Sequence, residues 1–195
     1  MNLSNAFSSA LISNRKSIVA TIAILAVSGT VIELLAGIWD ATSHLMREPE
    51  QFWTIQHIVV YTGVGLITCS AILSSIIILN PKNPSLKKEL KIIIIGALLQ
   101  ITAGYADSVS HEIYGIDGLV TVSHLVLETG LLLSALGGFL LLTAIKINHK
   151  IILKFSILSV LLSSTWIGFN LFLLVAPAPL CLPVYEGFSS GCAVL

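Results

Sequence analysis

The chain has 195 residues, of which 55% are hydrophobic and only 10% are charged, and its formal net charge at pH 7 is zero. A soluble domain has about 25% charged residues, and the mean hydropathy of this chain is +0.96. These values exclude an ordinary soluble protein and predict an integral membrane protein in a lipid bilayer. No nucleic-acid partner is expected.

Five long apolar runs follow one another along the chain, and most are close to the ~20 residues that a helix needs to cross a bilayer. Continuous runs argue against a membrane β-barrel, whose strands show short alternating patterns. We therefore predict an all-α fold with five transmembrane helices, of which the third is the shortest. The predicted helices cover residues 17–39, 54–79, 91–106, 121–147 and 151–175.

These helices divide the chain into two parallel helical-hairpin repeats and one extra helix. The first segment and the connection between the hairpins are expected in the cytoplasm, and the tail is expected outside the cell. The predicted units are a cytoplasmic N-terminal segment (1–16), the first hairpin (17–79), a cytoplasmic connection (80–90), the second hairpin (91–147), the fifth helix (151–175) and an extracytoplasmic tail (176–195).

The positive charges predict the orientation. Nine of the ten Lys and Arg residues lie in the N-terminal segment, the 80–91 connection or the 146–154 connection. Because basic residues concentrate in cytoplasmic loops, we predict a multi-pass protein of the cell membrane with a cytoplasmic N-terminus and an extracytoplasmic C-terminus. Cys181 and Cys192 in the tail form either a disulfide, which can persist outside the cell, or two unpaired thiols.

One polar pattern, an aspartate followed by two histidines, occurs twice at an interval of 67 residues. The two copies are Asp40-x3-His44-x12-His57 and Asp107-x3-His111-x12-His124. At this offset, 10 of the 28 positions from 36 to 63 are identical, whereas common residue frequencies would give roughly two. The chain therefore contains an internal duplication.

Each copy places three metal-ligating side chains on one hairpin. The aspartate lies at the outer end of one helix, the first histidine follows four residues later on the same face, and the second histidine begins the antiparallel helix. Imidazole is the commonest ligand of zinc, copper and iron, and a carboxylate offsets part of the metal charge. A solvated or helix-capping role would explain any single residue of the six, but their recurrence in register favours two metal sites with open coordination positions.

A second set of polar residues differs between the copies. Glu33 corresponds to Gln100, two turns deeper than the aspartates, and Tyr61 corresponds to Glu128, one turn deeper than the second histidines. Buried ionisable groups are costly unless paired. We interpret Glu33 and Glu128 as partners that orient the imidazoles, and Glu128 also as a candidate fourth ligand or proton relay. The alternative is a protonated carboxyl that is hydrogen-bonded between helices.

The Asp-x3-His-x12-His pattern on adjacent membrane helices resembles the copper-site motif of the C subunit of copper membrane monooxygenases, the particulate methane and ammonia monooxygenase family. In that family a second, similarly spaced motif follows and begins with Asn. The whole first pattern matches here, as do both histidines of the second pattern, while Asp107 stands where the family has Asn. The resemblance covers approximately residues 33–130. The chain looks like a divergent or paralogous member of that family.

The resemblance implies copper as the cofactor, an outward-facing site and partner subunits of a monooxygenase. It leaves open whether this chain belongs to an enzyme, serves as a non-catalytic copper-binding or accessory subunit, or forms a homo-oligomer. The residues alone also permit iron, because two histidines and a carboxylate form the facial triad of non-haem iron oxygenases. A further alternative is an electron-transfer protein in which His57 and His124 hold a b-type haem.

Overall fold

The computed structural model describes residues 15–45, 53–79, 86–114, 120–175, 181–182 and 193–194. Within this part of the chain there are five helices, and all five are long and apolar enough to cross a membrane. This confirms the predicted all-α membrane protein with five spans. The helices are α2 (Arg15–Leu45), α3 (Ile55–Leu79), α4 (Lys87–Tyr114), α5 (Val122–Ala144) and α6 (Lys150–Val175).

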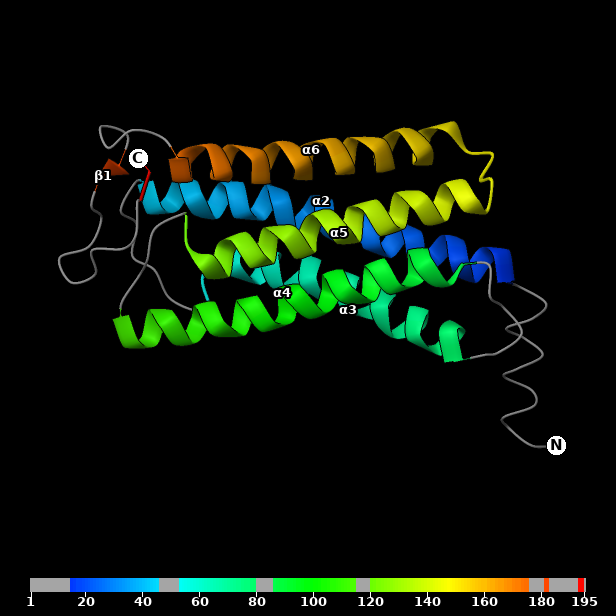
Figure 1. Ribbon diagram of the computed structural model, residues 1–195, viewed down its shortest axis with the longest axis horizontal. Helices are drawn as coiled ribbons and strands as arrows, with labels where there is room; N and C mark the ends of the chain where they lie inside the picture. Colours follow the sequence, from blue (N-terminus) through cyan, green and yellow to red (C-terminus); the bar gives the residue numbers. More distant parts are fainter. Residues whose placement is uncertain are drawn as a thin grey trace.

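Two antiparallel hairpins, α2 with α3 and α4 with α5, form the body of the molecule (Figure 1). Because α2 also contacts α5 and α3 also contacts α4, the four helices close into a bundle. This contact pattern relates the two hairpins by an approximate twofold axis that runs along the bundle. α6 packs outside the four helices against α5 and α2, as expected for a helix that has no counterpart in the repeat.

The same pair of glycines lies where the two helices of each hairpin meet. A Cβ atom added to Gly63 would lie 2.8 Å from the carbonyl oxygen of Gly29, and one added to Gly130 would lie 2.6 Å from that of Gly96. The backbones are therefore in direct contact, which is how small residues bring membrane helices together. Gly29 and Gly96 are themselves 67 residues apart, so the duplication extends beyond the segment that carries the ligands.

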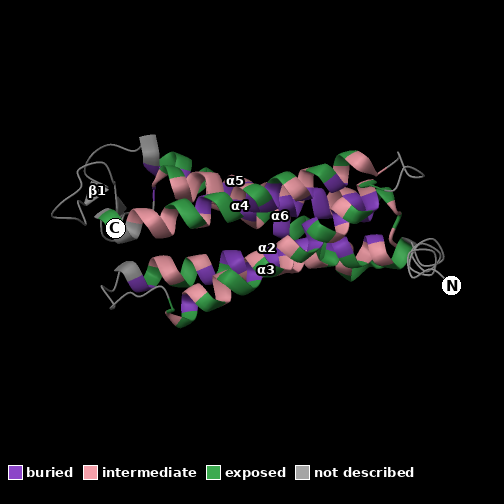
Figure 2. Cartoon of the chain, turned by 90° about the horizontal axis from the view of Figure 1, so that it is seen from below, coloured by how far each residue is buried: buried purple, intermediate pink, exposed green. Residues whose placement is uncertain are grey.

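The bundle buries its inner surface and leaves a large apolar outer surface. Ile22, Ile67 and Ile93 are completely buried between the helices, and Figure 2 shows buried residues concentrated where the two hairpins meet. Large apolar side chains such as Leu35 and Leu98 are more than half exposed. An exposed apolar surface of this extent would favour aggregation in water, whereas the hydrocarbon of a bilayer solvates it.

Two helices continue beyond the predicted apolar runs at the end of the bundle that carries Asp40 and Asp107. α2 ends at Leu45 and α4 at Tyr114, whereas the runs end at residues 39 and 106. α4 has 28 residues, so the prediction that the third helix is the shortest is wrong. The polar residues after positions 39 and 106 lower the local hydropathy and end the apolar runs. The helices continue there because a helix satisfies the hydrogen bonds of its own backbone. A helix of this length rises about 42 Å, which exceeds the ~30 Å of hydrocarbon and lets the polar turn protrude.

The described part of the tail contains two short strands, β1 (Cys181–Leu182) and β2 (Ala193–Val194), which pair antiparallel. The proposed disulfide partner of Cys181, Cys192, lies outside the described residues. The pairing of these two cysteines therefore stays a prediction.

Candidate metal centre

The first hairpin brings Asp40 and His57 together. Asp40 lies near the C-terminal end of α2 and His57 lies in the first turn of α3, so the two residues lie at the same end of the hairpin. The Nε2 atom of His57 is 3.1 Å from Oδ1 of Asp40. The two side chains are 16% and 22% exposed, although Oδ1 of Asp40 itself is buried.

The second hairpin repeats this pair with one additional contact. Nε2 of His124 lies 3.3 Å from Oδ1 of Asp107. Ser123 donates a hydrogen bond of 2.7 Å to the same Asp107 oxygen. Thr121 caps the N-terminus of α5, accepting a hydrogen bond from the backbone N–H of His124, which fixes where the helix begins and hence where the imidazole stands.

The separation of the two facing atoms suits a shared metal ion. Zinc binds imidazole nitrogen and carboxylate oxygen at about 2.0–2.2 Å, so two ligands of one such ion lie about 2.9 Å apart at a right angle and about 3.4 Å apart at a tetrahedral angle. The observed distances of 3.1 and 3.3 Å fall between these limits. Each Asp–His pair therefore fits two ligands of one transition metal, and each distance also fits an ion pair if the histidine is protonated.

The third residue of each set is placed by its backbone alone. α2 is continuous through His44 and α4 is continuous through His111, so each of these positions follows its aspartate by four residues on the same helix face. The side chains of His44 and His111 lie outside the description. Among the described side chains, no group of three His, Cys, Asp or Glu residues that could hold a metal ion is formed, and complete three-ligand sites stay a prediction.

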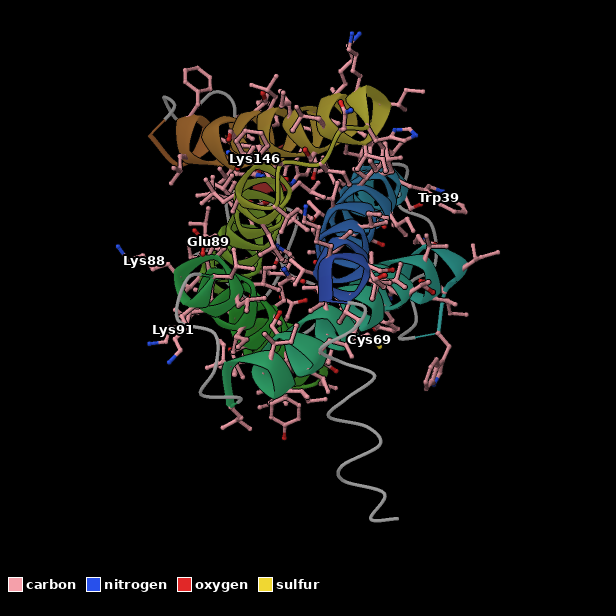
Figure 3. The ribbon with its side chains drawn as sticks, turned by 90° about the vertical axis from the view of Figure 1, so that its right-hand side faces the viewer. Trp39, Cys69, Lys88, Glu89, Lys91 and Lys146 are labelled. Atoms are coloured by element: carbon pink, nitrogen blue, oxygen red, sulfur yellow. The ribbon has the colours of Figure 1, made fainter. Side chains whose placement is uncertain are left out.

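Charge separates the two ends of the bundle. Lys87, Lys88 and Lys91 lie at the start of α4, and Lys146 and Lys150 flank the turn from α5 to α6, whereas both Asp–His pairs lie at the opposite helix ends. Figure 3 shows Lys88 and Lys91 pointing away from the bundle at the basic end. The sites and the basic residues are thus on opposite sides of the spans.

The deeper polar residues have different partners in the two copies. The Tyr61 ring is tilted against that of His57, with a centroid separation of 6.1 Å. At the corresponding place in the second copy, Glu128 is buried and accepts a 2.5 Å hydrogen bond from Nδ2 of Asn170 on α6. The carboxyl of Glu128 thus bonds across to the extra helix, as in the alternative interpretation of this residue, and its predicted role toward the imidazoles stays a prediction.

Two polar residues that bond to predicted site residues were not predicted from the sequence: Ser123 and Asn170. Ser123 directly precedes the predicted ligand His124. Thr121 followed by an apolar run is an N-cap pattern, and this pattern would have placed Ser123 in the first turn of the helix. Asn170 is the only amide in the last apolar run, and a polar side chain there indicates an interhelical bond. Its partner could not be predicted, because the contact joins residues 42 positions apart.

No family model matches this chain, and neither a curated protein nor a solved structure matches it. The resemblance to copper monooxygenase C subunits therefore rests on the repeated Asp/His pattern.

Proposed function

We propose that this protein binds copper at the outer side of a membrane, with one Asp/His/His site on each hairpin. The observation that supports the proposal is the repeated Asp–His pair, in which a carboxylate oxygen and an imidazole nitrogen face each other at 3.1 Å and 3.3 Å. Packing alone would preserve apolar residues and glycines through a duplication, and it would not require an aspartate and a histidine to meet in both copies.

Asp40, His44 and His57 would hold the first ion, and Asp107, His111 and His124 the second. Copper suits this donor set, because imidazole binds it strongly and the aspartate offsets part of its charge. A bound copper ion would supply one-electron redox chemistry or coordination of oxygen. The protein would supply three ligands on each hairpin and, in the second hairpin, the Ser123 hydrogen bond that orients the carboxylate.

We further propose that the chain is a C-subunit-like component of a copper membrane monooxygenase or a stand-alone relative. The order and spacing of the two patterns support this relation. The haem alternative is less well supported, because the Nε2 atoms of His57 and His124, which would bind haem iron, each face a carboxylate of their own hairpin.

Elemental analysis of detergent-purified protein tests the proposal directly. We expect about two copper equivalents in the wild type, and about one in His57→Ala or His124→Ala if each hairpin holds one ion. His149→Ala is the matched control, because this exposed histidine lies at the basic end of the bundle. Less than about half an equivalent of any transition metal, with no further loss in the double variant, would contradict the proposal.

The orientation is tested separately by labelling. We propose that the basic end is cytoplasmic and the Asp–His end is extracytoplasmic. In a cysteine-free background, His149→Cys should react with a membrane-impermeant maleimide only after the cells are lysed. Labelling of intact cells at this position would place the metal sites on the cytoplasmic side.

A further inference from the structure

Glu33 and Gln100 occupy equivalent positions in the two hairpins, each against the equivalent glycine of the neighbouring helix. They are only 3% and 1% exposed. A Cβ atom on Gly63 would lie 2.7 Å from Cβ of Glu33, and one on Gly130 would lie 2.9 Å from Cγ of Gln100. The two side chains therefore pack alike against these glycines, although one is a carboxyl and the other an amide.

Contacts between the hairpins place both residues at the same depth. Gln100 lies beside Gly130 on α5, and a Cβ atom on Gly138 of α5 would lie 3.4 Å from Cβ of Ala26 on α2. The eight residues from Gly138 to Gly130 rise about 12 Å toward the outer end, and the seven residues from Ala26 to Glu33 rise about 10 Å in the same direction. Glu33 and Gln100 thus lie in one layer, related by the approximate twofold axis.

The hydrogen bonds leave this layer rich in acceptors. Nε2 of Gln100 donates to Ser134 at 3.0 Å, and Ser134 donates to the carbonyl oxygen of Gly130 at 2.9 Å. The amide nitrogen is therefore engaged, while Oε1 of Gln100 is buried and has no partner among the described residues. In the first hairpin Ile67 stands where Ser134 would be. Both oxygens of Glu33 are buried, again with no hydrogen-bond partner in the described part of the chain.

We propose that Glu33 and Gln100 hold a monovalent cation, a proton or Na⁺, in the interior of the bundle. An ionised carboxylate without a partner is too costly to keep in a membrane interior, and a cation offsets that charge. Carboxylate and amide oxygens are the ligands that hard cations prefer. The proposal does not depend on metal binding at the Asp–His pairs.

The cation reaches the layer from the outer side. Toward the basic end, the next layers combine completely buried apolar residues, including Ile22, Ile93 and Leu141, with buried serine and threonine residues. The hydroxyls of Thr30, Ser70 and Ser74 donate to backbone carbonyl oxygens, and none of these side chains carries a charge that would attract an ion. The other buried acid of this region, Glu128, bonds to Asn170 on α6. The arrangement is therefore a closed binding site beneath the metal sites and not a channel through the membrane.

Infrared spectroscopy of the detergent-purified protein distinguishes the two occupants. In Na⁺-free buffer at neutral pH, we expect the C=O band of a protonated carboxyl that is lost in Glu33→Gln and retained in the control Glu128→Gln. If Na⁺ but not choline removes the wild-type band and raises the melting temperature of wild type but not of Glu33→Gln, the occupant is Na⁺. If the band persists in Na⁺, the occupant is a proton.

The Glu33→Gln variant reproduces the residue of the second hairpin and so preserves the size of the side chain. A second variant covers the case in which it does not fold. Ile67→Ser restores the hydroxyl that the second hairpin has, and the Glu33 band should shift because the carboxyl then gains a hydrogen-bond partner. The proposal is wrong if neither variant changes the spectrum and Na⁺ affects neither the spectrum nor the melting temperature.

Discussion

The contact between Gly63 and α2 predicts that a single added methyl group will destabilise the first hairpin. In Gly63→Ala, the new Cβ atom would lie 2.7 Å from Cβ and 2.8 Å from the backbone nitrogen of Glu33. Ordinary contacts begin at 3.4 Å, so the two helices must move apart by roughly 0.6 Å, an overpacking that costs about 1–3 kcal/mol. Alanine also improves helix propensity by about 1 kcal/mol, which offsets part of this cost.

Gly65→Ala is the matched control for this substitution. Gly65 lies on the same helix, and a Cβ atom added there meets nothing within 4 Å. It should gain the helix propensity without the clash. We therefore expect the free energies of unfolding of the two variants, measured by circular dichroism during titration of detergent micelles with SDS, to differ by about 1–3 kcal/mol. Equal stability of both variants would show that the helices are not in contact at this point.

Three further outcomes follow from the structure. Ser123→Ala removes the hydrogen bond to Asp107 and should weaken copper binding at the second site by about tenfold or more, which isothermal titration calorimetry of a His57→Ala background would measure; unchanged affinity would contradict the orienting role. Asn170→Leu removes the hydrogen bond from Asn170 to the Glu128 carboxyl and should lower stability by about 1–3 kcal/mol, whereas a neutral result in thermal unfolding would exclude a stabilising bond. A copper chelator should lower the melting temperature of wild type, since ligand at 100 times its Kd stabilises by about 2.7 kcal/mol; a melting temperature unaffected by the chelator would contradict metal binding in the folded state.

The sequence predicted the number of helices, their approximate positions and the division into two hairpins, because continuous apolar runs report directly on spans. It did not predict where α2 and α4 end. These ends lie in the polar turns that carry Asp40 and Asp107, and hydropathy cannot distinguish a helix that leaves the membrane from a loop.

The pairing of each aspartate with the second histidine could be inferred from spacing, since a short hairpin turn must return the chain to the same depth. The bond between Asn170 and Glu128 could not. It depends on which face α6 turns toward α5, and the inner face of α6 buries Ser156, Ser159 and Ser163 among apolar neighbours in the sequence. The mean hydropathy of the whole run does not reveal which face carries these serines.

The matching contacts of α2 with α5 and of α3 with α4 have an evolutionary consequence. A lone hairpin carrying one such pattern could reproduce the four-helix body by associating with a second copy of itself, and gene fusion would then join the two copies covalently. In a homodimer every substitution appears twice. Fusion would remove that constraint and allow one half to keep a carboxyl where the other keeps an amide.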